Sequence, residues 1–225
     1  MSASSTSELL FFTLWTGLCA TLFMLPVGIS TGFWLAHGRG RGRRAVETLC
    51  LLPLVLPPTA VGLLLLYLFQ EHGLLGQVME KLGFPVLFRW PAVVLAGAVM
   101  GFPLLVRAAR DAFIEVDPRL LGMARSLGKS RTQAFFRVAL PLAGRGILGG
   151  ALLAFARAVG EFGATVLVAG NIPGRTQTLS LAIFERVEIG RDESAMKLVA
   201  VSGVLAVGAV FGTELLQRTR TGGRR

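Results

Sequence analysis

Two oppositely charged side chains lie in an otherwise apolar stretch, at a spacing that lets them pair. Glu161 follows Arg157 by four residues, which places both on one face of a helix, one turn apart. On insertion scales a charged residue at the centre of a membrane helix costs about 2.5–3.5 kcal/mol, so Glu161 needs a partner. The residues favour mutual neutralisation of this pair over direct contact with a substrate, and a carboxylate would repel an anionic substrate in any case.

A polar stretch follows this pair, with the sequence NIPGRTQT at residues 171–178. A hydrated dianion could use its hydrogen-bond donors at the mouth of a site. The alternative is a β-turn around Pro173–Gly174 whose polar neighbours are only solvated. Both interpretations stay open at this stage. The donors are Asn171, Arg175, Thr176, Gln177 and Thr178.

The patterns that could bind a nucleotide or a metal fail on spacing or on context. Residues 122–130 fit G-x5-G-K-S, which is one residue longer than a phosphate-binding loop, and residues 144–149 fit G-x-G-x-x-G but precede an apolar segment. Neither follows a predicted strand. The two histidines, His37 and His72, lie in different loops, and the sequence contains no H-E-x-x-H. We therefore predict that the chain is not an enzyme, binds no ATP itself and holds no metal or other cofactor.

The apolar residues are arranged in blocks long enough to cross a bilayer. Of the 225 residues, 53% are hydrophobic and 16% are charged, and the mean hydropathy is +0.64. Hydrocarbon about 30 Å thick needs roughly 20 helical residues. These blocks predict one all-α membrane domain over residues 1–225, a bundle of about five transmembrane helices. The predicted spans are about residues 9–36, 48–69, 90–109, 147–169 and 198–216.

Proline interrupts several of the predicted spans. It removes a backbone donor and kinks a helix, which lipid tolerates where neighbouring helices satisfy the freed carbonyls. This pattern predicts a packed bundle rather than a single membrane anchor. The prolines concerned are Pro26, Pro53, Pro57, Pro58 and Pro103.

The net charge is +10, and most of the basic residues lie in the segments that are predicted to face the cytoplasm. With the N-terminus outside, segments 37–47, 107–146 and 217–225 face the cytoplasm and hold sixteen basic residues, against six in the outside segments. Membrane proteins show this positive-inside asymmetry. Anionic membrane lipid beside such loops accounts for the charge, so we predict no nucleic acid partner.

The cytoplasmic segment 115–146, between the third and fourth predicted spans, carries clear helix signals. Asp117 can cap a helix whose first residue is Pro118, where a missing N–H costs nothing. Gly128 can end that helix in a left-handed C-cap. The segment therefore begins with a short helix that has defined ends.

A second short helix should follow directly. Ser130 and Gln133 fit a capping box, and the helix should stop before Pro141. The resulting pair of helices would project from the membrane and present apolar residues for docking. A hairpin folded back on its own bundle is an equally weighted alternative. The apolar residues are Leu121, Ala124, Leu127, Phe135 and Phe136.

Residues 122–141 resemble the cytoplasmic signature of permeases from binding-protein-dependent ABC importers, E-A-A-x3-G-x9-I-x-L-P. Ala124, Gly128, Val138, Leu140 and Pro141 match its positions or replace them conservatively, whereas Gly122 and Met123 stand in place of Glu-Ala. The resemblance implies that this loop couples the chain to a separate ATPase subunit, which binds the ATP. The coupling residues would be Leu121, Ala124, Leu127, Gly128, Phe135, Phe136, Leu140 and Pro141.

The stretch GEFGATVLVAGNIPGRTQTLSLAIF, residues 160–184, resembles molybdate permease subunits within the tetrahedral-oxyanion branch of that family. The resemblance implies the type I importer (MetI-like) fold and a homodimer that works with two ATPase subunits and a periplasmic oxyanion-binding protein. It further implies a bacterial inner membrane location, with the N-terminus periplasmic and the C-terminus cytoplasmic. The cargo would be molybdate, with tungstate and sulfate as alternatives. A stand-alone secondary anion carrier is the rival function.

The family resemblance places the fourth span beside a translocation pathway at the dimer interface. We therefore hypothesise that Arg157 and Glu161 shape and gate that pathway and do not bind the oxyanion. The candidate pathway and gate residues are Arg157, Glu161, Thr165, Asn171, Arg175, Thr176, Gln177 and Thr178.

Overall fold

The computed structural model describes residues 5–38, 40 and 42–221 and, of their side chains, all except those of residues 209–210 and 212–221. Its regular elements are helices. They are α1 (Thr6–His37), α2 (Gly42–Val55), α3 (Pro58–Phe69), α4 (Gly76–Lys81), α5 (Trp90–Ile114), α6 (Pro118–Ser126), α7 (Arg131–Ala134), the π-helical turn η1 (Phe135–Ala139), α8 (Leu140–Val159), α9 (Gly163–Ala169), α10 (Leu179–Glu188) and α11 (Asp192–Thr221).

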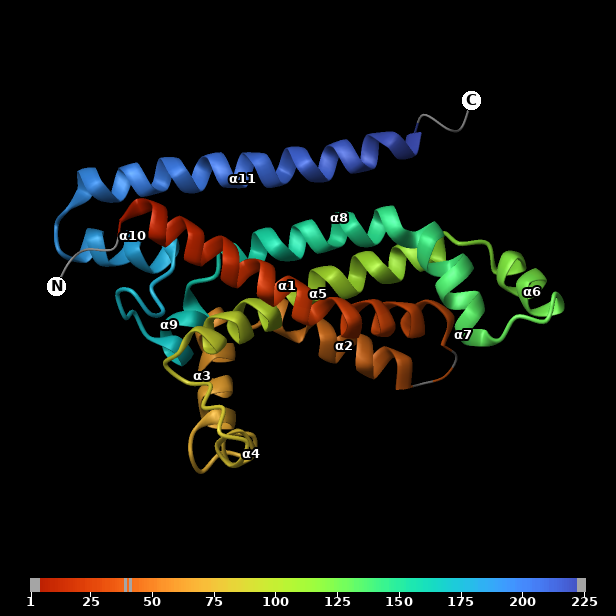
Figure 1. The fold of residues 1–225 in the computed structure, drawn as a ribbon, viewed down its shortest axis with the longest axis horizontal. Helices are drawn as coiled ribbons and strands as arrows, with labels where there is room; N and C mark the ends of the chain where they lie inside the picture. The colour runs from red at the N-terminus through yellow and green to blue at the C-terminus, as the bar shows by residue number, and fades with distance from the viewer. Residues whose placement is uncertain (1–4, 39, 41, 222–225) are drawn as a thin grey trace.

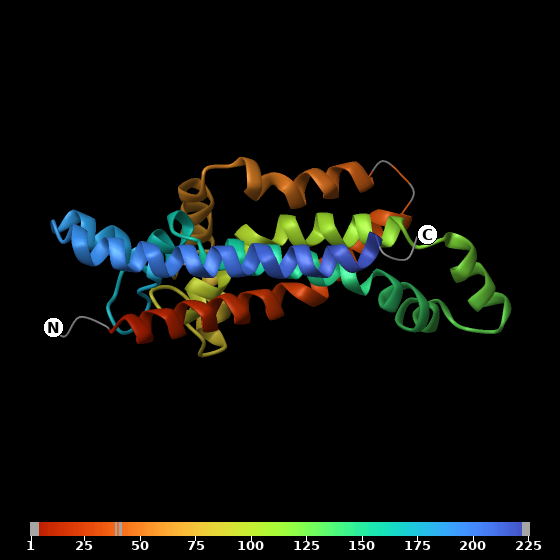
Figure 2. The same cartoon turned by 90° about the horizontal axis from the view of Figure 1, so that it is seen from above.

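Three long helices, α1, α5 and α8, lie side by side along the long axis, and α11 runs along α8 (Figure 1, Figure 2). Small residues let their backbones approach closely. A Cβ atom on Gly32 of α1 would lie 2.7 Å from the Cβ of Ala109 in α5. One on Gly150 of α8 would lie 2.4 Å from the Cβ of Ala108. The centre of the bundle therefore depends on glycine at these two crossings.

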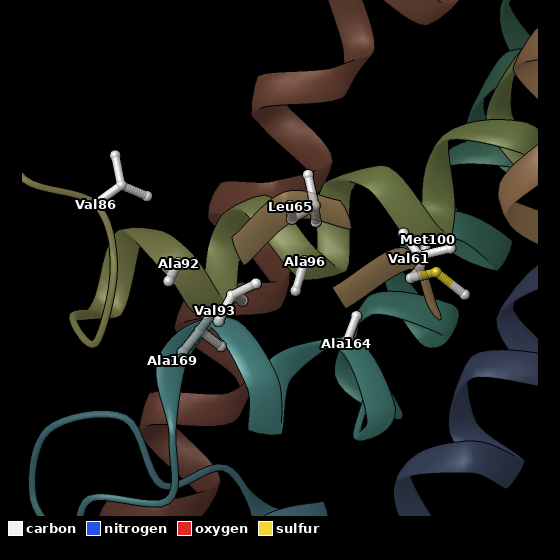
Figure 3. Close-up of a cluster of buried hydrophobic side chains, with 10 residues drawn as sticks. Val61, Leu65, Val86, Ala92, Val93, Ala96, Met100, Ala164 and Ala169 are labelled. Carbon is white, nitrogen blue, oxygen red and sulfur yellow. The ribbon is translucent and has the colours of Figure 1, made fainter. Parts of the chain in front are cut away.

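Helices α2 and α3 bend by 112° at a break within the predicted span 48–69. Pro57 and Pro58 lie at this break, and neither has an N–H with which to continue the hydrogen bonding of α2. Helix α3 then packs on α5 and α9 through a buried apolar cluster (Figure 3). Its members are Val61, Leu65, Val86, Ala92, Val93, Ala96, Met100, Ala164, Val168 and Ala169.

By length and composition, three helical runs of the described residues could cross a membrane. They are α1, α5 and the run from Arg131 to Val159, and the bent pair α2–α3 would make a fourth if it counts as one span. The predicted fifth span, 198–216, lies within α11, whose side chains are described only in part. The predicted span 147–169 contains a break, because α8 ends at Val159 and α9 starts at Gly163.

The connecting segments lie at opposite ends of the bundle. Helices α6 and α7 project beyond one end, whereas α9, α10 and the start of α1 lie at the other (Figure 1). The two stretches in which the sequence predicts functional residues are therefore separated by the length of the bundle.

The prediction that the second loop helix stops before Pro141 is wrong. The chain stays helical from α7 through η1 into α8, where Pro141 occupies the first turn. In η1 the Leu140 N–H donates to the carbonyl of Phe135, five residues earlier. The wider π-helical pattern shifts the hydrogen-bond register just ahead of Pro141, so that a residue without an N–H is accommodated.

Candidate functional site

Helix α8 ends and α9 begins within three residues, Gly160–Phe162. The Gly160 N–H donates to the carbonyl of Ala156 at 3.1 Å, which closes α8. Gly163 then starts α9 against α3, where a Cβ atom would lie 2.9 Å from the Cβ of Pro58. The close approach to α3 therefore fixes the place at which α9 begins.

Glu161 lies inside this break and contacts both sides of it. Its Oε2 lies 2.5 Å from Nη1 of Arg157 on α8, and its Oε1 accepts the backbone N–H of Ala164 on α9 at 2.8 Å. The Glu161 side chain is 1% exposed, and that of Arg157 is 27% exposed. The structure thus brings the two predicted charges together, and the pairing predicted from their spacing is confirmed.

Both oxygens of this carboxylate are engaged, so the group holds protein elements in place. The ion pair balances the buried negative charge, and the hydrogen bond to Ala164 satisfies one of the free N–H groups at the start of α9. Thr165, another predicted pathway residue, lies in the first turn of α9 and is fully buried. Its Oγ1 has no hydrogen-bond partner among the described atoms.

The end of the polar stretch, residues 176–178, folds inward, whereas Gly174 and Arg175 are exposed. Thr176, Gln177 and Thr178 are buried. Thr176 Oγ1 donates to the Gly170 carbonyl at 3.3 Å and accepts the Ile172 N–H at 3.1 Å, while Thr178 Oγ1 accepts the Leu181 N–H at 3.4 Å and caps α10. These hydroxyls are therefore used by the fold.

Glu185 on α10 collects the two amide side chains of the stretch. Its Oε2 accepts hydrogen bonds from Gln177 Nε2 and from Asn171 Nδ2, the latter at 3.4 Å. Sequence reasoning missed Glu185, although a carboxylate eight residues after Gln177 was the available signal. The amides of Asn171 and Gln177 are therefore oriented by a negative charge, which disfavours an anion beside them.

Arg175 is the exposed donor of the stretch, and it faces a groove of about 700 Å³. Arg89 lines the same groove, together with aromatic residues that include Trp15 and Trp90. Phe88 sits beside it at φ +55°, held by its N–H donating to the Val168 carbonyl at 3.0 Å. No hydrogen bond of the described residues joins this region to the Arg157–Glu161 pair.

The coupling loop has the helix ends that the sequence predicts. Asp117 Oδ1 accepts the Arg119 N–H at 2.9 Å at the start of α6. Gly128 follows α6 at φ +80°, a conformation that favours glycine. Ser130 and Gln133 form a reciprocal capping box at the start of α7. The predicted caps at both helices are therefore confirmed.

The apolar residues of the loop divide into an inward and an outward set. Phe135 packs in the bundle, with its ring centroid 4.8 Å from that of Phe33 and 5.9 Å from that of Phe113. Leu121 and Leu140 pack on the same cluster, and Ala124 is buried, while Pro141 is exposed. The outward set consists of Leu127, Phe136 and Met123, which are 79%, 59% and 62% exposed, and sequence reasoning missed Met123.

Comparisons with known proteins show the family to which the coupling loop and the helical bundle belong. The family described as "Binding-protein-dependent transport system inner membrane component" matches residues 11–218. The molybdenum transport system permease protein ModB of Escherichia coli is 41% identical over 201 residues, covering 88% of each chain. ModB of Mycobacterium bovis is 37% identical over 223 residues, covering 98% of this chain and 84% of its own.

A solved structure shows the same fold at low sequence identity. The structure of the MetNI methionine ABC transporter in inward-facing conformations contains a chain that is 18% identical, with a TM-score of 0.68. The match covers 96% of this chain and 94% of that one. The predicted all-α, MetI-like fold class is confirmed by this similarity.

Proposed function

Because the chain belongs to the binding-protein-dependent inner membrane components of ABC importers, we propose that it is the permease subunit through which molybdate enters the cell. Family membership makes the chain a multi-pass inner membrane protein that works with an ATPase subunit and a periplasmic binding protein. It is a non-catalytic transport subunit whose family binds no cofactor itself. Membership of this family also excludes the rival function, a stand-alone secondary anion carrier.

The observation that carries the proposed mechanism is the outward set on the coupling loop. Leu127 is 79% exposed on a turn whose two flanking helices are both capped. The inward set, above all Phe135, ties the same loop to α1 and α5. A movement of the ATPase against Leu127 would therefore be transmitted to the bundle through packed side chains rather than through a loose loop.

The transport cycle follows from two such loops in a homodimer. Closure of the ATPase subunits around ATP would draw the loops together, turn the pathway outward and admit the oxyanion, and hydrolysis would return it inward. This requires two packings of the bundle of similar free energy, each favoured by different ligands. The 112° bend between α2 and α3, at Pro57 and Pro58, is the place where helices could pivot in this change.

The orientation and the cargo rest on separate support. The excess of basic residues in segments 37–47, 107–146 and 217–225 supports a periplasmic N-terminus and a cytoplasmic C-terminus. Molybdate is supported by the two ModB relatives and by the resemblance of residues 160–184. The burial of residues 176–178 and the use of the Asn171 and Gln177 amides by Glu185 support a passage without a tight anion site, so that selectivity would reside in the binding protein.

The test is ATP hydrolysis by the chain reconstituted with its genomically neighbouring ATPase and binding protein. Molybdate, tungstate, sulfate and phosphate are each supplied to separate samples. We expect loaded binding protein to stimulate hydrolysis most strongly with molybdate. Stimulation by sulfate or tungstate alone would assign the chain to that oxyanion instead. Uptake that proceeds without the ATPase would contradict the proposal.

A further inference from the structure

From Pro118 onward the exposed face of the coupling loop is basic, whereas the exposed residues Glu115 and Asp117 at its start are acidic. Between Pro118 and Arg137 the sequence contains five basic residues and no Asp or Glu. All five side chains belong to exposed residues. None of them takes part in an ion pair of the described residues. The basic residues are Arg119, Arg125, Lys129, Arg131 and Arg137.

Three of these cations converge on one shallow hollow at the turn between α6 and α7. Arg125, Lys129 and Arg131 line it together with Gly122. A Cβ atom on Gly122 would meet nothing within 4 Å, so the hollow has room for a side chain from elsewhere. Gly122, which stands where the importer signature carries Glu, therefore lines an open hollow together with three cations.

We propose that this hollow receives carboxylate side chains of the ATPase subunit, so that the coupling contact pairs a basic loop with an acidic cleft. The inference rests on the proposed function, because it concerns the partner that the coupling loop meets. Opposite charges brought together in this way increase the association rate and fix the orientation of docking. Like charges on the ATPase surface would disfavour the same docking.

The place of the loop favours a protein partner over membrane lipid. Helices α6 and α7 lie beyond the end of the long helices (Figure 1). A separate hollow lies where α2 begins and α5 nears its end, and it is lined by Arg43, Arg44 and the ion pair of Arg110 with Glu47. The exposed apolar residues Met123 and Leu127 lie in the same segment as the cations, as in an interface core with a charged rim.

The first test measures the affinity of the chain, in nanodiscs of neutral lipid, for the purified ATPase subunit at about 0.05 and 0.5 M NaCl, concentrations at which screening of exposed charges differs strongly. We compare the wild type with the triple variant Arg125→Gln, Lys129→Gln and Arg131→Gln. At low salt the triple variant should bind roughly 10-fold more weakly, since each exposed ion pair contributes a few-fold. Its affinity should also depend less on salt than that of the wild type.

The matched control is the double variant Arg43→Gln and Arg44→Gln, which removes charge from the separate hollow. It should bind the ATPase like the wild type at both salt concentrations. Unchanged binding by the triple variant would overturn the inference. If that variant instead lost binding to vesicles containing phosphatidylglycerol, its charges would be assigned to lipid.

A second measurement detects the contact itself. A carbodiimide joins an amine to a neighbouring carboxylate, and Lys129 is the lysine within the hollow. We expect peptide mapping to show Lys129 joined to an Asp or Glu of the ATPase in the assembled complex. Absence of that cross-link in an assembled complex would contradict the inference and leave the proposed function intact. A wild-type chain that binds no ATPase would instead contradict the proposed function, and the inference with it.

Discussion

The guanidinium of Arg157 and the carboxylate of Glu161 form an ion pair at the point where helix α8 ends, with 2.5 Å between Nη1 and Oε2. The second oxygen of Glu161 accepts the backbone N–H of Ala164 at 2.8 Å. One buried carboxylate therefore fastens the end of α8 to the beginning of α9. Both helices also contact α5, which therefore supports the chain on each side of the break.

The two members of this pair should respond unequally to substitution. Arg157→Met leaves the Glu161 carboxylate buried without a counter-charge and should lower the free energy of unfolding by about 3 kcal/mol. Glu161→Gln should cost less, roughly 1–2 kcal/mol, because Arg157 is partly exposed and the amide oxygen can still accept the Ala164 N–H. Unfolding of the purified chain in mixed micelles measures both values.

The control is the exposed pair between Glu193 and Lys197, which has the same i,i+4 spacing. Lys197→Met should change the free energy of unfolding by less than about 0.5 kcal/mol. Equal losses of unfolding free energy in all three variants would contradict a special role of the buried pair.

The gating hypothesis has a separate test in transport. If the Glu161→Gln variant kept full uptake and full ATPase coupling, that hypothesis would be withdrawn.

The contact between α3 and α9 should depend on the absence of a side chain at Gly62. A Cβ atom there would lie 2.8 Å from the Cα of Ala164 and 2.9 Å from its carbonyl oxygen. Gly62→Ala should therefore push α3 from α9 and lower stability by about 1–3 kcal/mol. Gly144→Ala is the matched control, since its Cβ would meet nothing within 4 Å. Thermal unfolding that is equal for both variants would refute this contact.

Helix α10 should depend on one hydroxyl of α1. Thr13 Oγ1 accepts the backbone N–H of Leu179 at 2.9 Å and donates to the Leu9 carbonyl at 2.7 Å. Thr13→Val would leave the buried Leu179 N–H without a partner, at a cost of about 1–3 kcal/mol. Hydrogen exchange at the start of α10 should rise accordingly. Thr21→Val, which removes only a bond to the Gly17 carbonyl within α1, should leave that exchange unchanged.

Local signals in the sequence were sufficient for the parts of the molecule that local interactions determine. The caps at Asp117, Gly128 and Ser130 depend on neighbours within a few residues. The pairing of Arg157 with Glu161 likewise needs only one turn of helix. These features were predicted because their partners lie close by in the chain.

Features that depend on distant partners were missed. Leu127 and Phe135 are both apolar residues of one loop, and the positions of Phe33 and Phe113 on other helices place Phe135 inside. The hydrogen bond from the Leu179 N–H to Thr13 also joins distant residues, and it follows from how α1 and α10 meet. The π-helical turn before Pro141 arises because the loop helix joins α8 without a break.

ATP hydrolysis by the reconstituted importer, with Leu127→Asp beside Leu74→Asp, tests the coupling role most directly. Both leucines are highly exposed, at 79% and 82%, but Leu127 lies on the coupling loop and Leu74 on the connection between α3 and α4. Leu127→Asp should remove most of the stimulation by loaded binding protein, since a charge would replace an apolar contact with the ATPase, and Leu74→Asp should retain it. Full stimulation in the Leu127→Asp importer would contradict the assignment of this loop as the contact that couples ATP hydrolysis to transport.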